Sequence, residues 1–339
     1  MAERAELPLI EPLYKTYNYQ GSATVLLAGN PSIQNRYFNQ VMNLTCSRRF
    51  LKGLTTPIVD IPDSSWQSCP YLERIALPVQ FTKGYINPII REMIDSGYYV
   101  EFTDVDDYYV KGKSWYRERH QGHDGLICGY DRSDQTYTVV AYDEKWVYRK
   151  FRTPQRAFNA GRIAMEKRGI GVGIYALKPK ADIVEFSPRT VYEKLREYLD
   201  SDLRKYPFSG EGPVFGIAVH DYIAEYAAML FRGEIPYARM DRRVLRLIWE
   251  HKCVMQKRIV LVEKSLGLDD SISRAYAALV RRADTMRMLY ASHHMRRRDS
   301  VLPVIRQGLL QLAEEERALL TQLTLKMEGR HIGEAVAFS

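Results

Sequence analysis

The sequence predicts an α+β protein in which a small antiparallel sheet with helices is followed by a C-terminal helical bundle. Two observations predict this fold class. Between residues 98 and 148, short runs of apolar residues alternate with polar ones and are separated by turn-forming residues, which is typical of antiparallel strands. Beyond about residue 241, apolar residues recur only at helical spacing, which indicates helices that pack against one another.

The first part of the chain indicates helices separated by irregular segments. Gly21 and Ser22 precede a short apolar run that stops at Gly29, and this pattern indicates a loop, a helix cap and a helix. A second helix is predicted over residues 34–44. A third is predicted over residues 87–97, because a proline lies in its first turn and a glycine at its end.

Strands are predicted over residues 98–103, 125–129 and 137–142. The turn-forming residues at 131–134 favour an antiparallel hairpin between the last two of these strands. The late helices predict a three-helix antiparallel bundle. We therefore expect two domains, an α+β domain over residues 9–235 and a helical bundle over residues 240–328.

Composition restricts the classes of function. The 339 residues carry a net charge of +8, which suits an acidic partner such as a carrier protein, a charged small substrate or nucleic acid. The N-terminus lacks the apolar segment of a signal peptide, and no apolar run is long enough to span a membrane. The cysteines are too widely spaced for a disulfide framework or a structural zinc site, so we expect a cytoplasmic protein: Cys46, Cys69, Cys128 and Cys253.

The strongest candidate for chemistry is the pair His123 and Asp143. His123 begins one predicted strand of the hairpin and Asp143 follows the other, so both side chains can reach the same end of the sheet. A carboxylate that accepts a hydrogen bond from one imidazole nitrogen holds the ring in one tautomer and leaves the other nitrogen available as a general base. The same spacing also occurs in strands that have no catalytic role.

Residues 123–131, with Tyr137 and residues 141–143 behind them, resemble the N-terminal domain of the butirosin-biosynthesis acyltransferase family. That family is similar to the papain-like cysteine peptidases that process bacteriocin leaders. Further matching stretches lie at residues 69–72, 97–100, 106–109 and 250–252, so the resemblance spans most of residues 12–325. It implies a papain-like fold for the first domain, with His123 and Asp143 as the second and third members of a catalytic triad.

The sequence departs from this family where the nucleophile is expected. A papain-like enzyme needs a thiolate at the N-terminus of its first helix. Here Ser22 stands at that place, and Gln20 is positioned as a donor to an oxyanion. Ser22 could equally be a helix N-cap, and Cys46 is the other thiol to consider in this region. Three interpretations remain: a serine-dependent acyltransferase, an enzyme that uses His123 and Asp143 without a covalent step, and a degenerate binding scaffold.

The resemblance implies an acyl- or amide-forming transferase of natural-product or antibiotic biosynthesis. Its substrate would be a thioester on an acidic acyl or peptidyl carrier protein, or a peptide. The alternative is a catalytically degenerate papain-like binding or scaffold protein. Nucleic acid is the least favoured partner because only the charge suggests it, and the helical region is a candidate surface for a homodimer. We expect no cofactor and no metal, because His120 and His123 lack a third ligand and the acidic residues 104–107 lack calcium-loop spacing.

Overall fold

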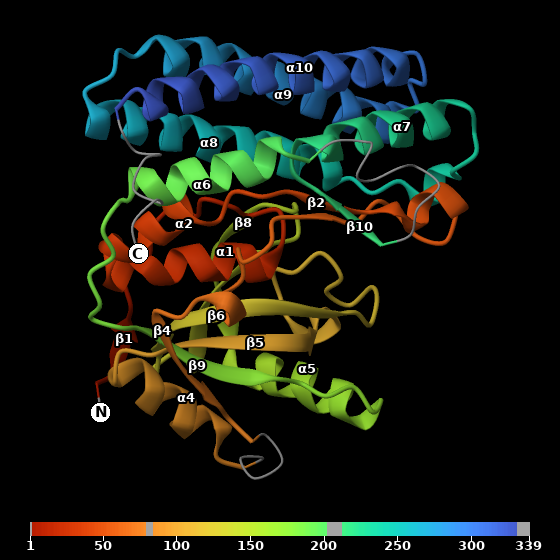
Figure 1. The fold of residues 1–339 in the computed structure, drawn as a ribbon. Coiled ribbons are helices and arrows are strands. Elements are labelled where there is room, and N and C mark those ends of the chain that lie inside the picture. Colours follow the sequence, from red (N-terminus) through yellow and green to blue (C-terminus); the bar gives the residue numbers. More distant parts are fainter. Residues whose placement is uncertain (1, 79–83, 202–211, 331–339) are drawn as a thin grey trace. The chain divides into compact units, whose positions relative to one another are not determined.

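The structure is a computed structural model that describes residues 2–78, 84–201 and 212–330. Two compact units divide the chain (Figure 1): Met1–Gln34 with Ser64–Ile183, and Asn35–Asp63 with Val184–Ser339. Mixed α+β structure with an antiparallel sheet and a helical C-terminal region confirms the predicted fold class.

These units differ from the predicted division at residues 235–240. The second unit takes in residues 35–63 and begins again at Val184, so the chain passes between the units three times. The physical reason lies in α6 (Pro188–Leu199) and α7 (Val219–Phe231), whose buried faces pack against α10 (Val301–Glu328). Their apolar faces need the later helices as partners, and the sequence spacing alone does not reveal this.

The first unit is built on a seven-stranded antiparallel sheet with the strand order β4-β9-β5-β6-β7-β8, to which β1 adds beside β6. The predicted strands all occur in it. Its members are β1 (Arg4–Glu6), β4 (Leu72–Ala76), β5 (Tyr99–Asp106), β6 (Gly122–Asp131), β7 (Thr136–Tyr142), β8 (Tyr148–Pro154) and β9 (Ile174–Pro179).

Helices cover both faces of this sheet (Figure 1). One face packs against α4 (Ile86–Asp95) and α5 (Gln155–Lys167), and Phe102 of β5 meets Phe158 of α5 with ring centroids 5.3 Å apart. On the opposite face lies α1 (Asn18–Val25), which contacts β6 and β7. Side chains alternate between the two faces along each strand. We refer below to the α5 face and the α1 face.

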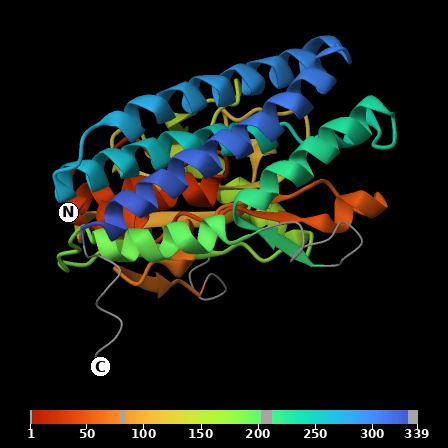
Figure 2. The ribbon, with the colours of Figure 1, turned by 45° about the horizontal axis from the view of Figure 1, so that its top comes forward.

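The second unit contains a small antiparallel sheet and six α-helices among its described residues. The sheet has the order β10-β2-β3. Figure 2 shows the long C-terminal helices side by side, and contacts join α8 to α9 and α9 to α10, as the predicted bundle requires. The elements are α2 (Gln34–Asn39), β2 (Thr45–Ser47), β3 (Val59–Asp60), α6, β10 (Pro213–Phe215), α7, α8 (Val244–Leu266), α9 (Ser271–Arg296) and α10.

The second predicted helix is shorter than expected, because α2 ends at Asn39 instead of continuing to residue 44. Arg258 of α8 explains the end of this helix. Its guanidinium donates to the carbonyl of Phe38 at 2.6 Å, of Tyr37 at 2.9 Å and of Val41 at 2.8 Å. Carbonyls near a helix end need such partners, and the partner here lies more than two hundred residues away in sequence.

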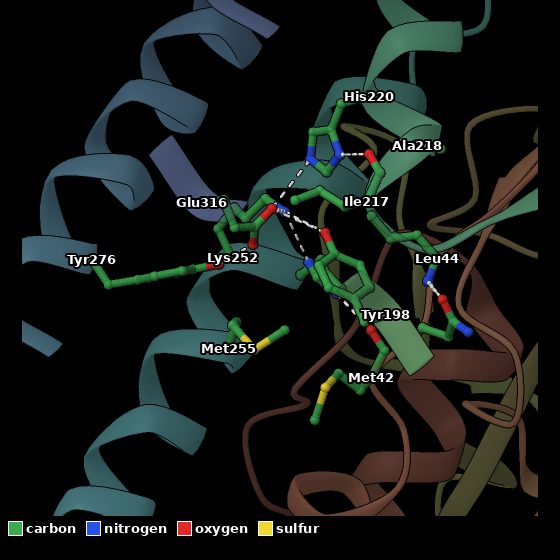
Figure 3. A network of polar contacts seen from close by, with 12 residues as sticks. Met42, Leu44, Tyr198, Ile217, Ala218, His220, Lys252, Met255, Tyr276 and Glu316 are labelled. Carbon is green, nitrogen blue, oxygen red and sulfur yellow. Dashed lines mark hydrogen bonds and ion pairs between the residues drawn. The ribbon is translucent and has the colours of Figure 1, made fainter. Parts of the chain in front are cut away.

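A buried polar network joins the five large helices of this unit (Figure 3). Glu316 of α10 lies at its centre and accepts from Lys252 of α8 at 2.6 Å and from Tyr198 of α6 at 3.0 Å. The Tyr276 hydroxyl of α9 also donates to Glu316, and His220 of α7 lies 3.8 Å from it. Burial of these groups requires that each finds a partner, so the network fixes how the helices pack.

Among the residues that the structure describes, no helix combines the length and the apolar composition needed to cross a membrane.

Candidate functional site

Two histidine–aspartate pairs lie side by side where β5 ends and β6 begins. The register of these strands shifts between Phe102 and Val105, and Asp104 in this bulge adopts a φ of 56°. Bulges redirect the neighbouring side chains and are frequent next to functional sites. After the bulge, Asp106 and Asp107 face the segment that enters β6.

The first pair joins His123 to Asp107. The Nδ1 atom of His123 lies 2.6 Å from Oδ2 of Asp107, and the other carboxylate oxygen lies 3.5 Å from Nζ of Lys113. Asp107 and Lys113 are buried, whereas 30% of the His123 side chain is exposed. A buried carboxylate therefore orients an imidazole that reaches the surface.

This geometry can perform general acid–base chemistry. The Asp107 carboxylate accepts from Nδ1, which leaves Nε2 to accept a proton from a substrate. Within the described residues, no side chain is hydrogen-bonded to that Nε2 atom. Burial lowers the pKa of Lys113, although the nearby Asp107 carboxylate opposes this shift. Trp146 lies edge-on to the imidazole, 6.3 Å between centroids, and forms an aromatic wall beside it.

The second pair joins His120 to Asp106, and this pair was not predicted above. Asp106 is buried and accepts from the amides of Tyr108 and Gln121, both at 3.1 Å. Its other oxygen lies 2.7 Å from Nδ1 of His120, whose ring stacks on Tyr108 at 4.3 Å. The signal was present in the sequence, because two adjacent aspartates precede two histidines three residues apart.

Asp143 is not the partner of His123. Leu126 of β6 lies opposite Val140 of β7. His123 precedes Leu126 and Asp143 follows Val140, so both residues lie near the same end of the sheet. However, Asp143 turns its carboxylate into its own turn. It accepts from the amides of Lys145 at 2.8 Å and Val147 at 2.9 Å and forms an ion pair with Arg149. Burial opposes ionisation, but these contacts outweigh it and hold the pKa of Asp143 below its usual value.

Ser22 does not pair with His123 in this structure. Within the described residues, the side chain hydrogen-bonded to a ring nitrogen of His123 is that of Asp107. Ser22 belongs to α1, and its fully buried hydroxyl makes no hydrogen bond to His123.

Ser22 is not a helix cap either. Because α1 begins at Asn18, Ser22 is the fifth residue of the helix and lies inside it. Its hydroxyl contributes to the environment of Glu101, a fully buried residue of β5, and of Tyr148 in β8. Neither carboxyl oxygen of Glu101 reaches ideal hydrogen-bond geometry. Burial raises the pKa of Glu101 well above its usual value, against the smaller effects of Ser22 and Trp66.

Gln20 is also buried, and its amide nitrogen donates to the hydroxyl of Ser64 at 3.1 Å. The Tyr148 ring lies directly against Gly21, the next residue of α1. Bulky side chains and hydrogen bonds thus occupy the place where the resemblance implies a nucleophile and an oxyanion donor.

Three of the four thiols lie in surroundings that disfavour the thiolate form. Cys46 and Cys128 are fully buried, and burial raises the pKa of Cys46 and raises the pKa of Cys128 to about 12. Cys253 of α8 is half-buried, and burial raises its pKa to about 11. A thiolate at neutral pH requires the opposite shift.

No group of three or more metal-binding side chains is present among the described residues. His120 and His123 each use a ring nitrogen for an aspartate, and these aspartates point to different histidines.

Comparison with known proteins adds no relationship: no known protein family matches the chain, and no curated protein matches it.

Proposed function

We propose that the chain is an acyl- or amide-forming transferase in which His123 is the general base and no covalent enzyme intermediate forms. The acyl donor is a thioester on an acidic carrier protein, or a peptide, in a cytoplasmic pathway of natural-product biosynthesis. The acceptor amine attacks the thioester carbonyl, a C–N bond forms, and the C–S bond breaks. His123 takes the proton from the amine and returns it to the departing thiolate.

One observation carries this proposal: the buried Asp107 carboxylate holds Nδ1 of the partly exposed His123 at 2.6 Å. A base oriented in this way needs only a bound donor and acceptor, because proximity replaces covalent catalysis. The resemblance to the butirosin-biosynthesis acyltransferase family supports the reaction class, and an antiparallel sheet with α1 against one face is compatible with its papain-like fold. The net charge of +8 suits an acidic carrier.

A second function is favoured by a different observation. Ser22 and Gln20 are fully buried, and Tyr148 packs against the helix between them. This filled interior supports a catalytically degenerate papain-like protein that binds a carrier or peptide as a scaffold.

Thioester turnover distinguishes the two functions. The full chain is mixed with a panel of acyl-pantetheine thioesters and primary amines, and thiol release and amide product are measured. We expect His123→Gln to lower the rate by roughly 10²–10⁴-fold, the usual contribution of a general base. Asp107→Asn should lower it by at least about tenfold, because the imidazole loses the partner that fixes its tautomer.

His294→Gln is the matched control, because it removes a histidine of α9 outside this site. It should leave the rate unchanged. Thiol release that is equal in the wild-type chain and in His123→Gln would overturn the transferase proposal and leave the binding function.

A further inference from the structure

A hollow of about 410 Å³ lies on the α5 face, beside the second histidine–aspartate pair. His120 and Tyr109 line one side, and the C-terminal half of α5 lines the other. Binding sites for small molecules commonly have volumes of about 300–1,000 Å³. The hollow is therefore large enough for a small ligand, and the lining determines its chemistry.

The charged lining is exclusively cationic. Lys167 and Arg168 both line the hollow, and within the described part of the chain neither forms an ion pair with a carboxylate. The neighbouring Arg162 differs, because it pairs with Glu166 at 2.6 Å on the same helix. Glu166 is thus paired with Arg162, and the positive charges of Lys167 and Arg168 remain in the lining of the hollow.

His120 adds a directed donor. Its Nδ1 atom is held by Asp106, its ring is stacked on Tyr108, and about half of the side chain is exposed. In an imidazolium both ring nitrogens are donors, so Nε2 can donate to a ligand while Nδ1 donates to Asp106.

The remaining lining is apolar. Ile163 and Ala164 of α5 border the hollow, and 41% of Ile163 is exposed to solvent. An exposed isoleucine beside cations fits a ligand with a charged end and an apolar body.

We propose that this hollow binds a small phosphate monoester through Lys167, Arg168 and His120, with its apolar part against Ile163. A phosphate monoester carries nearly two negative charges and three acceptor oxygens, which match two cations and an imidazole N–H. Arginine binds phosphate in a bidentate manner, and lysine adds a point charge. The site does not depend on the proposed acyl transfer.

The end of α5 works against an anion but is weaker than the cations. A helix C-terminus carries about half of a negative charge. Lys167 and Arg168 together carry two full positive charges at the same place, so the net field still favours the phosphate.

Ligand-observed NMR on the full chain tests the site with phenyl phosphate as the probe. We expect saturable binding at low ionic strength, tighter than that of inorganic phosphate or of benzyl alcohol, which each lack half of the ligand. The double variant Lys167→Gln/Arg168→Gln should weaken the binding of phenyl phosphate by at least roughly tenfold. His120→Gln should weaken it less, because one donor is lost and both cations remain.

The matched control is Arg296→Gln/Arg298→Gln, which removes the same charge from exposed positions near the end of α9. It should bind phenyl phosphate as the wild type does. The proposal is overturned by the absence of saturable binding, by unchanged binding in the first double variant, or by an equal loss in the control. Acyl-pantetheine turnover, with donors that lack a phosphate, reports on the transferase separately.

Discussion

At the residue scale, the chemistry of the β5–β6 edge depends on which atom each buried carboxylate contacts. The carboxylates of Asp107 and Asp106 each contact one imidazole. In contrast, the carboxylate of Asp143 accepts hydrogen bonds from two backbone amides and forms an ion pair with an arginine. A carboxylate in an extended loop can satisfy itself locally through the amides of its own turn. That local option is the physical reason why Asp143 and His123, although close to the same sheet end, do not form the predicted pair.

Glu101 gives a prediction at this scale. Burial raises its pKa, so the unfolded chain releases its proton near pH 4.5 while the folded chain retains it. The folded state then binds more protons, and stability falls as the pH rises from about 4.5 toward the pKa of the folded state. Glu101→Gln removes this dependence. We expect urea unfolding to show that the variant gains stability relative to the wild type between pH 5 and pH 8.

Parallel curves of stability against pH for the wild type and Glu101→Gln would contradict this prediction. Glu118→Gln is the control, because it replaces an exposed glutamate of the same unit and should leave the pH dependence unchanged.

At the scale of elements, hydrophobic periodicity determined which segments form helices and strands. Contacts with residues distant in sequence determined where some of these elements end. The hairpin β6–β7 has the alternation seen in the sequence. In contrast, α2 stops at Asn39 because Arg258 binds the carbonyls around its end. The buried network around Glu316 also depends on contacts between segments that are distant in sequence. Tyr198, His220 and Lys252, which surround Glu316, each come from a different helix.

Acid should destabilise the helical unit through this network. Burial, with help from Lys252, lowers the pKa of His220 to about 4, and burial also lowers the pKa of His251. An unfolded histidine binds its proton near pH 6.5, so stability is present above that pH and is lost as the pH falls toward about 4. The loss from His220 alone is roughly 3 kcal/mol at the end of this range.

The measurement is guanidinium unfolding followed by far-UV circular dichroism at pH 7 and pH 4.5. We expect His220→Gln to reduce the difference between the two pH values. An unchanged difference in His220→Gln would show that this histidine does not drive the acid effect.

At the scale of the whole molecule, the chain forms two units that each combine distant segments. The sequence suggested one boundary near residue 235, because the segment beyond it contains only helices. The structure instead assigns α6 and α7 to the same unit as α8–α10. Their buried faces need α10, and Tyr198 and His220 need Glu316.

Truncation tests this organisation. A chain that ends at residue 235 lacks α8–α10, which leaves the apolar faces of α6 and α7 uncovered and Tyr198 without its carboxylate partner. We expect it to aggregate or to lose near-UV circular dichroism and cooperative unfolding. A chain that ends at Arg330 retains every described helix and should unfold as the full chain does. Cooperative unfolding of the shorter chain would instead support an independent domain over residues 9–235.

The sequence by itself determined the fold class, the antiparallel hairpin and the helical C-terminal region. These depend on hydrophobic periodicity, which is a local property of the chain. It also made His123 a candidate, because a histidine at the start of a strand can reach the sheet end.

Only the tertiary structure determined which side chains contact one another at the site. The burial of Ser22, the pairing of His123 with Asp107 and not Asp143, and the placement of His120, Lys167 and Arg168 around one hollow all depend on strand register and helix packing. A bulge in β5 is enough to redirect the side chains of Asp106 and Asp107 beyond it. The site is therefore a property of the folded sheet, because its members come from segments that the sequence pattern treats separately.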